Sequence, residues 1–179
     1  ILKKISTYFT KNDITSESRD LLESKLIEEN YNLLTSVIDR YPSASKPTLE
    51  QLLNKLIMHA FFDKKGDNGE QIGFVNEFIL GAFIGENILD ERETWLGSER
   101  FLDFVITSYM PRAEKTKKEL YEILDGVILD MVSPSKRAFI DNYLFGQINH
   151  NVENAVLTDI EFRDKFKTDV TIKNVIFSN

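Results

Sequence analysis

The chain has 179 residues, 42% of them hydrophobic, with a formal net charge of −7 and no cysteine. This length and composition suit one ordinary domain with a small appendage, and no run approaches the 18 or more apolar residues that a membrane helix needs. The missing cysteines exclude thiol catalysis, disulfides and cysteine zinc sites, and the negative charge gives no overall attraction for nucleic acid or an anionic membrane.

Both ends of the sequence resemble cut ends. The chain opens on Ile1, without an initiator methionine or an apolar signal segment. It stops at Asn179, directly after an apolar and strand-like run. We therefore expect a segment of a longer polypeptide.

Helical periodicity dominates the first 149 residues. Apolar residues recur every three or four positions from Ser18 to Arg40, which predicts one helix that closes at Pro42. Thr48 and Gln51 have the spacing of a capping box, so a second helix is expected over 49–62, with His59 at its boundary with the core.

A short hairpin and a central helix are expected next. The turn sequence Asp67-Asn-Gly69 favours a hairpin that pairs Phe61-Phe62 with residues 72–74, like a small wing. Residues 74–89 are apolar on nearly every side, which predicts a helix packed in the core.

Three further helices follow from caps and apolar stripes. Ser98 can cap a helix that ends before Pro111, and residues 118–131 repeat the apolar stripe. Ser133-Pro134 is an N-cap followed by proline at the first helical position, which predicts a helix through Ile148.

The pattern changes to a five-residue period after residue 149. Every fifth residue from Asp159 is Asp or Asn, and four of the five middle positions are bulky and apolar, the positions being Leu157, Phe162, Lys167, Ile172 and Phe177. Such a period is typical of a square β-coil, in which the middle side chain points to the axis and the corner residue makes the turn. This tail resembles pentapeptide-repeat proteins, with Lys165 and Lys167 departing from the pattern. An ordinary pair of strands is the alternative, because residues 170–173 also alternate with period two.

No pattern of catalytic or cofactor-binding residues is present in the sequence. There is no phosphate-binding Gly-Lys-Ser/Thr loop, no His-Glu-x-x-His run and no nucleophile elbow. We therefore expect no catalytic, cofactor-binding or metal site in this segment. The acids Glu77, Glu86, Glu99 and Asp103 remain the candidates for an alternative, metal-dependent site.

Two surface features are candidates for interaction. The densest positive cluster consists of Arg112, Lys115, Lys117 and Lys118, which suit phosphates or an acidic partner, or form a solvated face balanced by neighbouring glutamates. Trp95 suits a surface anchor for a partner, or a partly buried core position.

The stretch from Leu52 to Leu89 resembles a known family. It contains the sequence Phe74-Val-Asn-Glu-Phe-Ile-Leu-Gly-Ala-Phe-Ile-Gly85. This sequence is similar to the motif Phe-x-His-x-x-Phe-x-Glu-Tyr-x-Ala of NACHT-type signalling ATPases, which belong to the STAND class. In that family the motif joins a winged-helix region to a helical arm, which in bacteria is often followed by repeat sensors. Asn76 replaces the usual His and Gly81 stands near the usual Glu, so the switch role of that His is not carried over. Gly81 and Gly85 have the spacing for a close helix crossing.

The sequence thus predicts a mainly α fold: a multi-helix array with a wing-like hairpin and a short β tail that begins a right-handed β-solenoid. We expect a helical domain over 1–149 and a pentapeptide-repeat-like segment over 150–179. The resemblance implies a cytoplasmic, non-catalytic arm of a larger STAND ATPase, with phage defence as one expected role. This arm would couple a repeat sensor to the nucleotide module and contact other domains or protein partners. The alternatives are a small metal-dependent enzyme and a helical nucleic-acid-binding module.

Overall fold

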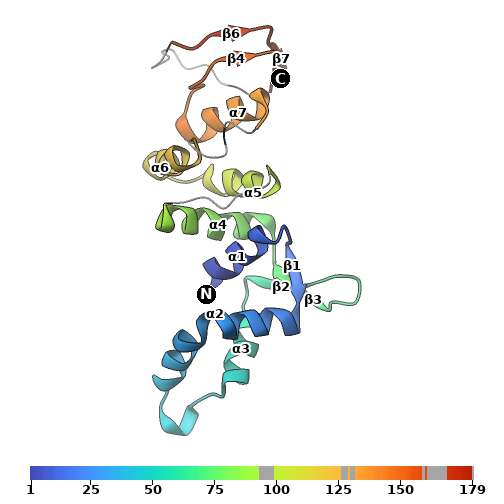
Figure 1. Ribbon diagram of the computed structural model, residues 1–179, viewed down its shortest axis with the longest axis vertical. Coiled ribbons are helices and arrows are strands. Elements are labelled where there is room, and N and C mark those ends of the chain that lie inside the picture. The colour runs from blue at the N-terminus through green and yellow to red at the C-terminus, as the bar shows by residue number, and fades with distance from the viewer. Residues whose placement is uncertain (93–98, 126–128, 130–131, 159, 161–168, 179) are drawn as a thin grey trace. The chain divides into compact units, whose positions relative to one another are not determined.

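A computed structural model describes residues 1–92, 99–125, 129, 132–158, 160 and 169–178 (Figure 1). It is mainly helical, with one three-stranded antiparallel sheet and two pairs of short parallel strands. The chain forms two compact units, Ile1–Leu80 and Gly81–Asn179, and the expected change from helix to strand at residue 150 lies inside the second. Within the described ranges, no helix combines the length and the apolar character needed to cross a membrane.

The first unit combines three α-helices with a three-stranded sheet. In chain order its elements are α1 (Leu2–Lys11), β1 (Ser16–Ser18), α2 (Arg19–Asp39), the 3₁₀ turn η1 (Ser43–Ser45), α3 (Leu49–Ile57), β2 (Phe62–Lys65) and β3 (Gln71–Phe74). The strands are ordered β1-β3-β2 and are antiparallel. The expected hairpin is confirmed, whereas sequence analysis predicted neither α1 nor β1.

The central strand of the sheet has a glycine at a position that leaves no room for a side chain. Gly73 lies opposite Ser16 in β1, and a Cβ at Gly73 would come within 2.6 Å of the Thr15 carbonyl oxygen. Beneath the strands, the Phe74 ring packs edge-on against Phe9 of α1, at a centroid distance of 5.9 Å, and lies 4.9 Å from Phe62. The hairpin is therefore fixed to α1 by aromatic packing.

The start of α3 agrees with its sequence signal, whereas its end does not. The predicted capping box is confirmed, because the Thr48 hydroxyl accepts from the Gln51 amide at 3.2 Å and the Gln51 side chain accepts from the Thr48 amide at 3.0 Å. α3 ends at Ile57, five residues before the predicted end at 62. His59 consequently lies beyond the helix and is exposed, which corrects its expected boundary position.

The second unit contains the remaining helices. They are α4 (Glu77–Glu91, which begins in the first unit), α5 (Glu99–Tyr109), α6 (Glu114–Asp125), α7 (Pro134–Ile140) and the π-helical segment η3 (Asp141–Phe145). The predicted cap of α7 is confirmed, since the Ser133 hydroxyl accepts from the Lys136 amide. The predicted helix through Ile148 instead changes to π geometry and stops at Gly146, which has a φ of 92°.

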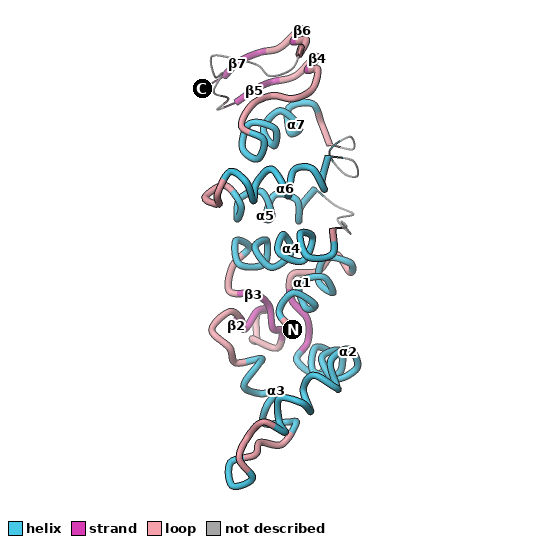
Figure 2. Tube along the Cα trace, turned by 90° about the vertical axis from the view of Figure 1, so that its left-hand side faces the viewer, coloured by secondary structure: helices cyan, strands magenta, loops and turns pink. Residues whose placement is uncertain are grey.

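The tail pairs with itself at a constant offset. β4 (Val152–Glu153) pairs in parallel with β6 (Ile172–Lys173), and β5 (Val156–Thr158) pairs in parallel with β7 (Ile176–Ser178), each strand lying 20 residues before its partner (Figure 2). Asn154 and Asn174, which follow β4 and β6, have φ values of 54° and 51°. These two corners fit the five-residue pattern, whereas Phe162, Lys165 and Lys167 lie outside the described residues.

Candidate functional site

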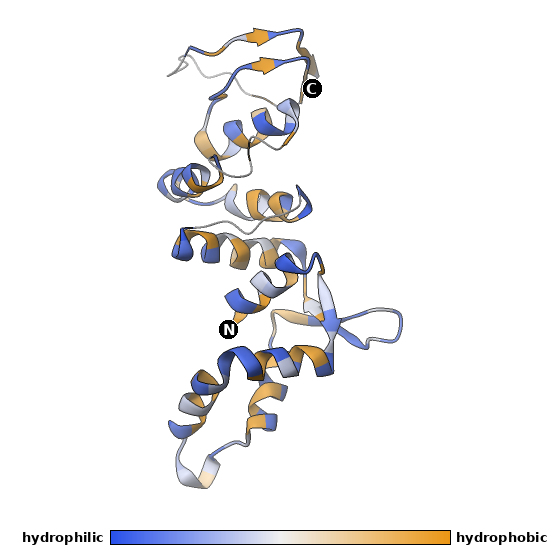
Figure 3. Ribbon diagram, in the orientation of Figure 1, coloured by the Kyte–Doolittle hydropathy of each residue, from blue (hydrophilic) through white to orange (hydrophobic). Residues whose placement is uncertain are grey.

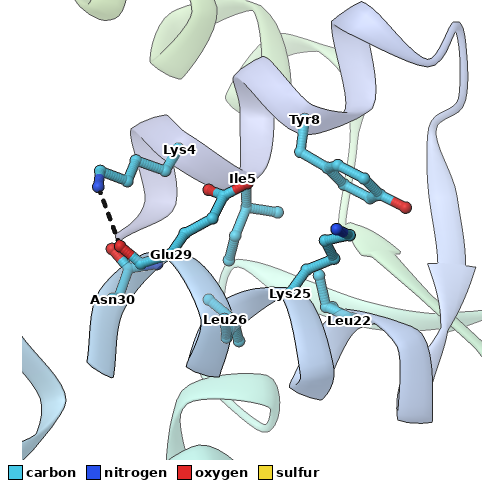
Figure 4. Close-up of a pocket in the computed structure, with 8 residues that line it drawn as sticks. All are labelled: Lys4, Ile5, Tyr8, Leu22, Lys25, Leu26, Glu29 and Asn30. Carbon is cyan, nitrogen blue, oxygen red and sulfur yellow. Dashed lines mark hydrogen bonds between the residues drawn. The ribbon is translucent and has the colours of Figure 1, made fainter.

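The hollow between the first two helices is too small for a ligand. It lies between α1 and α2 and has a volume of about 10 Å³, which is room for one water molecule (Figure 4). Its polar rim is engaged internally, because Lys4 Nζ donates to the Glu29 carbonyl oxygen at 3.3 Å. The candidate site lies elsewhere, in the joint between the helices and the strands of the tail.

A fully buried aspartate lies at the centre of that joint. Asp141 begins η3, and its side chain is 0% exposed. Its Oδ1 atom accepts from the Tyr121 hydroxyl of α6 at 2.7 Å and from Arg137 Nε of α7 at 3.2 Å. Its Oδ2 atom accepts from the Asn149 amide at 2.6 Å and contacts His150 Nδ1 at 2.7 Å. One carboxylate thus holds two helices and the first residues of the tail; below we call these five residues the Asp141 cluster.

The charges of the Asp141 cluster complement one another. Arg137 is almost fully buried and forms ion pairs with both Asp141 and the more exposed Asp125. Burial, aided by the hydrogen bond to Asp141, raises the pKa of Tyr121 to about 12, so its hydroxyl remains a proton donor at neutral pH. The contact between His150 Nδ1 and Asp141 Oδ2 suits the His150 tautomer that carries its hydrogen on Nδ1, because a carboxylate oxygen accepts hydrogen bonds. A buried carboxylate with this many partners strongly favours a single arrangement of its neighbours.

An apolar contact completes the joint. Ala138 of α7 and Ile148 form one buried cluster with Val152, Ala155 and Leu157 of the tail. The Val156 amide also donates to the Ser135 hydroxyl of α7 at 3.1 Å. In Figure 3 the apolar residues of β4 and β6 are flanked by hydrophilic ones, as expected for strands that bury one side. α7 therefore covers the inward-facing residues of β4 and β5.

The predicted helix-packing residues lie on α4. Asn76 caps this helix, its Oδ1 atom accepting from the Ile79 amide at 2.9 Å, and it is exposed. Gly81 lies against α5, where a Cβ would come 2.1 Å from the Phe104 carbonyl oxygen. Gly85 lies against the same helix, where a Cβ would come 2.2 Å from the Tyr109 ring. The absence of side chains at the two glycines is what allows α4 and α5 to approach this closely.

Tyr109, which packs on Gly85, carries an unsatisfied hydroxyl. The residue is fully buried, and its hydroxyl has no hydrogen-bond partner among the described residues. Burial raises the pKa of this tyrosine above its usual value. Its ring also lies under the Arg112 guanidinium, at 5.5 Å.

Removing that hydroxyl is expected to stabilise the protein. Tyr109→Phe should raise the free energy of unfolding by about 1 kcal/mol, because an unpaired buried hydroxyl is costly and the ring contacts are kept. The matched control is Tyr121→Phe, which removes a hydrogen bond to a carboxylate and should lower stability by about 1.5–3 kcal/mol. Urea titrations measure both, and a loss of stability in Tyr109→Phe would show that the hydroxyl has a polar partner.

The predicted basic cluster is balanced by acids. Lys117 lies 2.7 Å from Glu114 and Lys115 lies 3.9 Å from Glu119, while Arg112 lies 3.7 Å from Glu86. Lys118 is half-buried on the same helix as the other two lysines. These contacts match the balanced, solvated face better than a phosphate-binding patch. Trp95 lies outside the described residues.

Two of the acids named for a metal site are paired with basic side chains. Glu86 pairs with Arg112, and Asp103 pairs with Lys136 of α7. Across the part of the chain that the structure describes, no group of three or more His, Asp or Glu residues is arranged to hold a metal ion.

Sequence reasoning missed the Asp141 cluster. The four-residue spacing of Arg137 and Asp141 is ordinary for a surface ion pair on a helix. His150 appeared only as one of two scattered histidines. The available signal was an aspartate four residues after an arginine in a helical pattern, which is too common to single out.

Comparison with known proteins gives no relative for the chain. No protein-family model, curated protein or solved structure matches it.

Proposed function

We propose that this chain is a non-catalytic coupling segment, in which a helical arm rigidly carries a β-coil of five-residue repeats. The observation that carries the proposal is the Asp141 cluster, because its buried carboxylate joins α6, α7 and the start of the tail. A displacement of the tail cannot leave that carboxylate in place without breaking buried, charged hydrogen bonds, so the displacement is passed to the helices.

The register of the tail supports the β-coil. A four-sided coil with five residues on each side advances one turn in 20 residues, and both parallel strand pairs have that offset. The inward positions alternate as a coil requires, since Val152, Ala155 and Leu157 are buried while Glu153 and Val156 are exposed. We take the two strand pairs as successive turns of a right-handed solenoid.

The arm is proposed to belong to a larger signalling ATPase of the STAND class. Three features in chain order support this: the winged-helix order of the first unit, the apolar helix α4 with its two glycines, and the repeat tail. In such a protein the tail would sense a ligand and the helices would transmit the change to a nucleotide module in the cytoplasm. The ligand-bound and ligand-free states would then differ in how the arm packs.

The reading frame that encodes this chain tests the ATPase part of the proposal. We expect it to encode a phosphate-binding Gly-x-x-x-x-Gly-Lys-Ser/Thr loop, between a strand and a helix, upstream of these residues. A complete reading frame without such a loop would remove the ATPase from the proposal, while the rigid joint would be tested separately.

A further inference from the structure

Helix α2 is interrupted at a buried asparagine. Asn30 has a φ of −130° and a ψ of 15°, which lie outside the helical range, so α2 consists of two helical halves joined at a kink. The residue is only 4% exposed, and its Oδ1 atom has no hydrogen-bond partner among the residues that the structure describes. A buried amide oxygen without a partner is costly, so this atom requires a hydrogen-bond donor.

Asn30 also lines the hollow between α1 and α2 (Figure 4). The volume of the hollow, about 10 Å³, is close to the ~10–15 Å³ that one held water molecule needs. Its wall combines buried apolar side chains with a polar rim, the former being Ile5, Leu22 and Leu26 and the latter Lys4, Tyr8, Lys25 and Glu29. A held water needs two to four polar partners, which Asn30 and the rim can supply.

We propose that this hollow binds one water molecule, which donates a hydrogen bond to Asn30 Oδ1. The volume excludes larger occupants, and the ammonium groups of Lys4 and Lys25 on the rim oppose a cation. The site lies in the first unit and is independent of the coupling function proposed above.

The proposed water holds the kink of α2 in place together with α1. Lys4 Nζ of α1 already donates to the carbonyl oxygen of Glu29, the residue directly before the interruption. The water adds a second link, between the Asn30 side chain and the polar rim. A water that bridges buried polar groups in this way is part of the structure and is held far longer than a surface water.

Nuclear Overhauser transfer from water to methyl groups of the full chain tests the site. Ile5, Leu22 and Leu26 line the hollow, and their methyl groups carry no exchangeable protons. We expect transfer from water to the methyl groups of at least one of these residues. Leu34 is the matched control, because it lies on the same helix and is fully buried but does not line the hollow, so its methyl groups should receive none.

Substitutions of Asn30 separate a held water from proton exchange at the rim. Asn30→Leu removes the acceptor oxygen and leaves every exchangeable proton of the rim in place, so the transfer should be lost. Asn30→Asp keeps an oxygen of the same reach, so the transfer should remain. Asn32→Leu makes the same change at an exposed position of α2 and should leave the transfer unchanged.

Three results would overturn the proposal. The unchanged chain shows no transfer from water to the methyl groups of the hollow; the transfer persists in Asn30→Leu, which makes the rim protons its source; or it disappears equally in Asn30→Asp, which removes Oδ1 as the acceptor. The first comparison needs only the unchanged chain, so it decides the proposal even where Asn30→Leu does not fold.

Discussion

Asp141→Ala is expected to lower the free energy of unfolding by about 3–5 kcal/mol. The substitution leaves the buried Arg137 guanidinium without its buried partner, and it removes the acceptor of the Tyr121 hydroxyl and of the Asn149 amide. Since a domain of this size is stable by only about 5–15 kcal/mol, the variant should unfold at much lower urea concentrations.

Asp125→Ala is the matched control for that measurement. Asp125 pairs with the same guanidinium, but its side chain is 41% exposed. Ion pairs with an exposed partner contribute about 1 kcal/mol or less, so the control should remain close to the unchanged chain. Equal losses in the two variants would show that Arg137, and not the buried carboxylate, determines the stability of the joint.

Gly81→Ala is expected to lower the free energy of unfolding by about 1–3 kcal/mol, even though alanine is the better helix former by about 1 kcal/mol. The added methyl group would overlap the Phe104 carbonyl group and approach the Val105 amide, so the backbones of α4 and α5 must separate. Thermal unfolding followed by circular dichroism measures the effect.

Gly85→Ala is the comparison variant, because its added methyl group would meet a side chain and not the backbone. Its methyl group would meet the ring of Tyr109, a side chain that can be shortened. The double variant Gly85→Ala/Tyr109→Leu should therefore lose less stability than the sum of the losses in the two single variants. For Gly81→Ala combined with Tyr109→Leu, the loss should equal the sum of the two single losses. Purely additive values at both sites would rule out the close crossing of α4 and α5.

Local signals in the sequence predicted much of the helical structure. The Thr48 capping box and the Ser133-Pro134 cap are contained in a few neighbouring residues, and both were found at the predicted positions. Apolar periodicity gave the range of α2 to within one residue at each end. Caps and apolar periodicity depend on residues that are near one another in the sequence, so they can be recognised from the sequence alone.

Elements that depend on distant partners were not predictable. β1 consists of Ser16, Glu17 and Ser18, which have no strand character of their own and become a strand by pairing with β3. α7 changes to π geometry at Asp141, where the buried carboxylate turns toward α6 and the tail. Both outcomes are decided by residues far away in the sequence, which periodicity does not reveal.

The candidate site was equally hidden, because its residues come from three separate parts of the chain. Tyr121, Asp141 and His150 each fit an ordinary surface or core position when read alone. Their joint role follows only from the geometry that brings them to one carboxylate.

Backbone hydrogen exchange tests the rigid joint most directly. The amides of Val152 and Asn154 donate to Thr171 and Lys173 across the two turns, and they report on opening of the tail. In the unchanged chain they should open with the same free energy as the amides of α7. In Asp141→Asn, whose amide group cannot accept from both the helices and the tail, the tail amides should exchange faster while α7 keeps its protection. Tail amides that already exchange independently of α7 in the unchanged chain would contradict the claim that helices and tail move as one body.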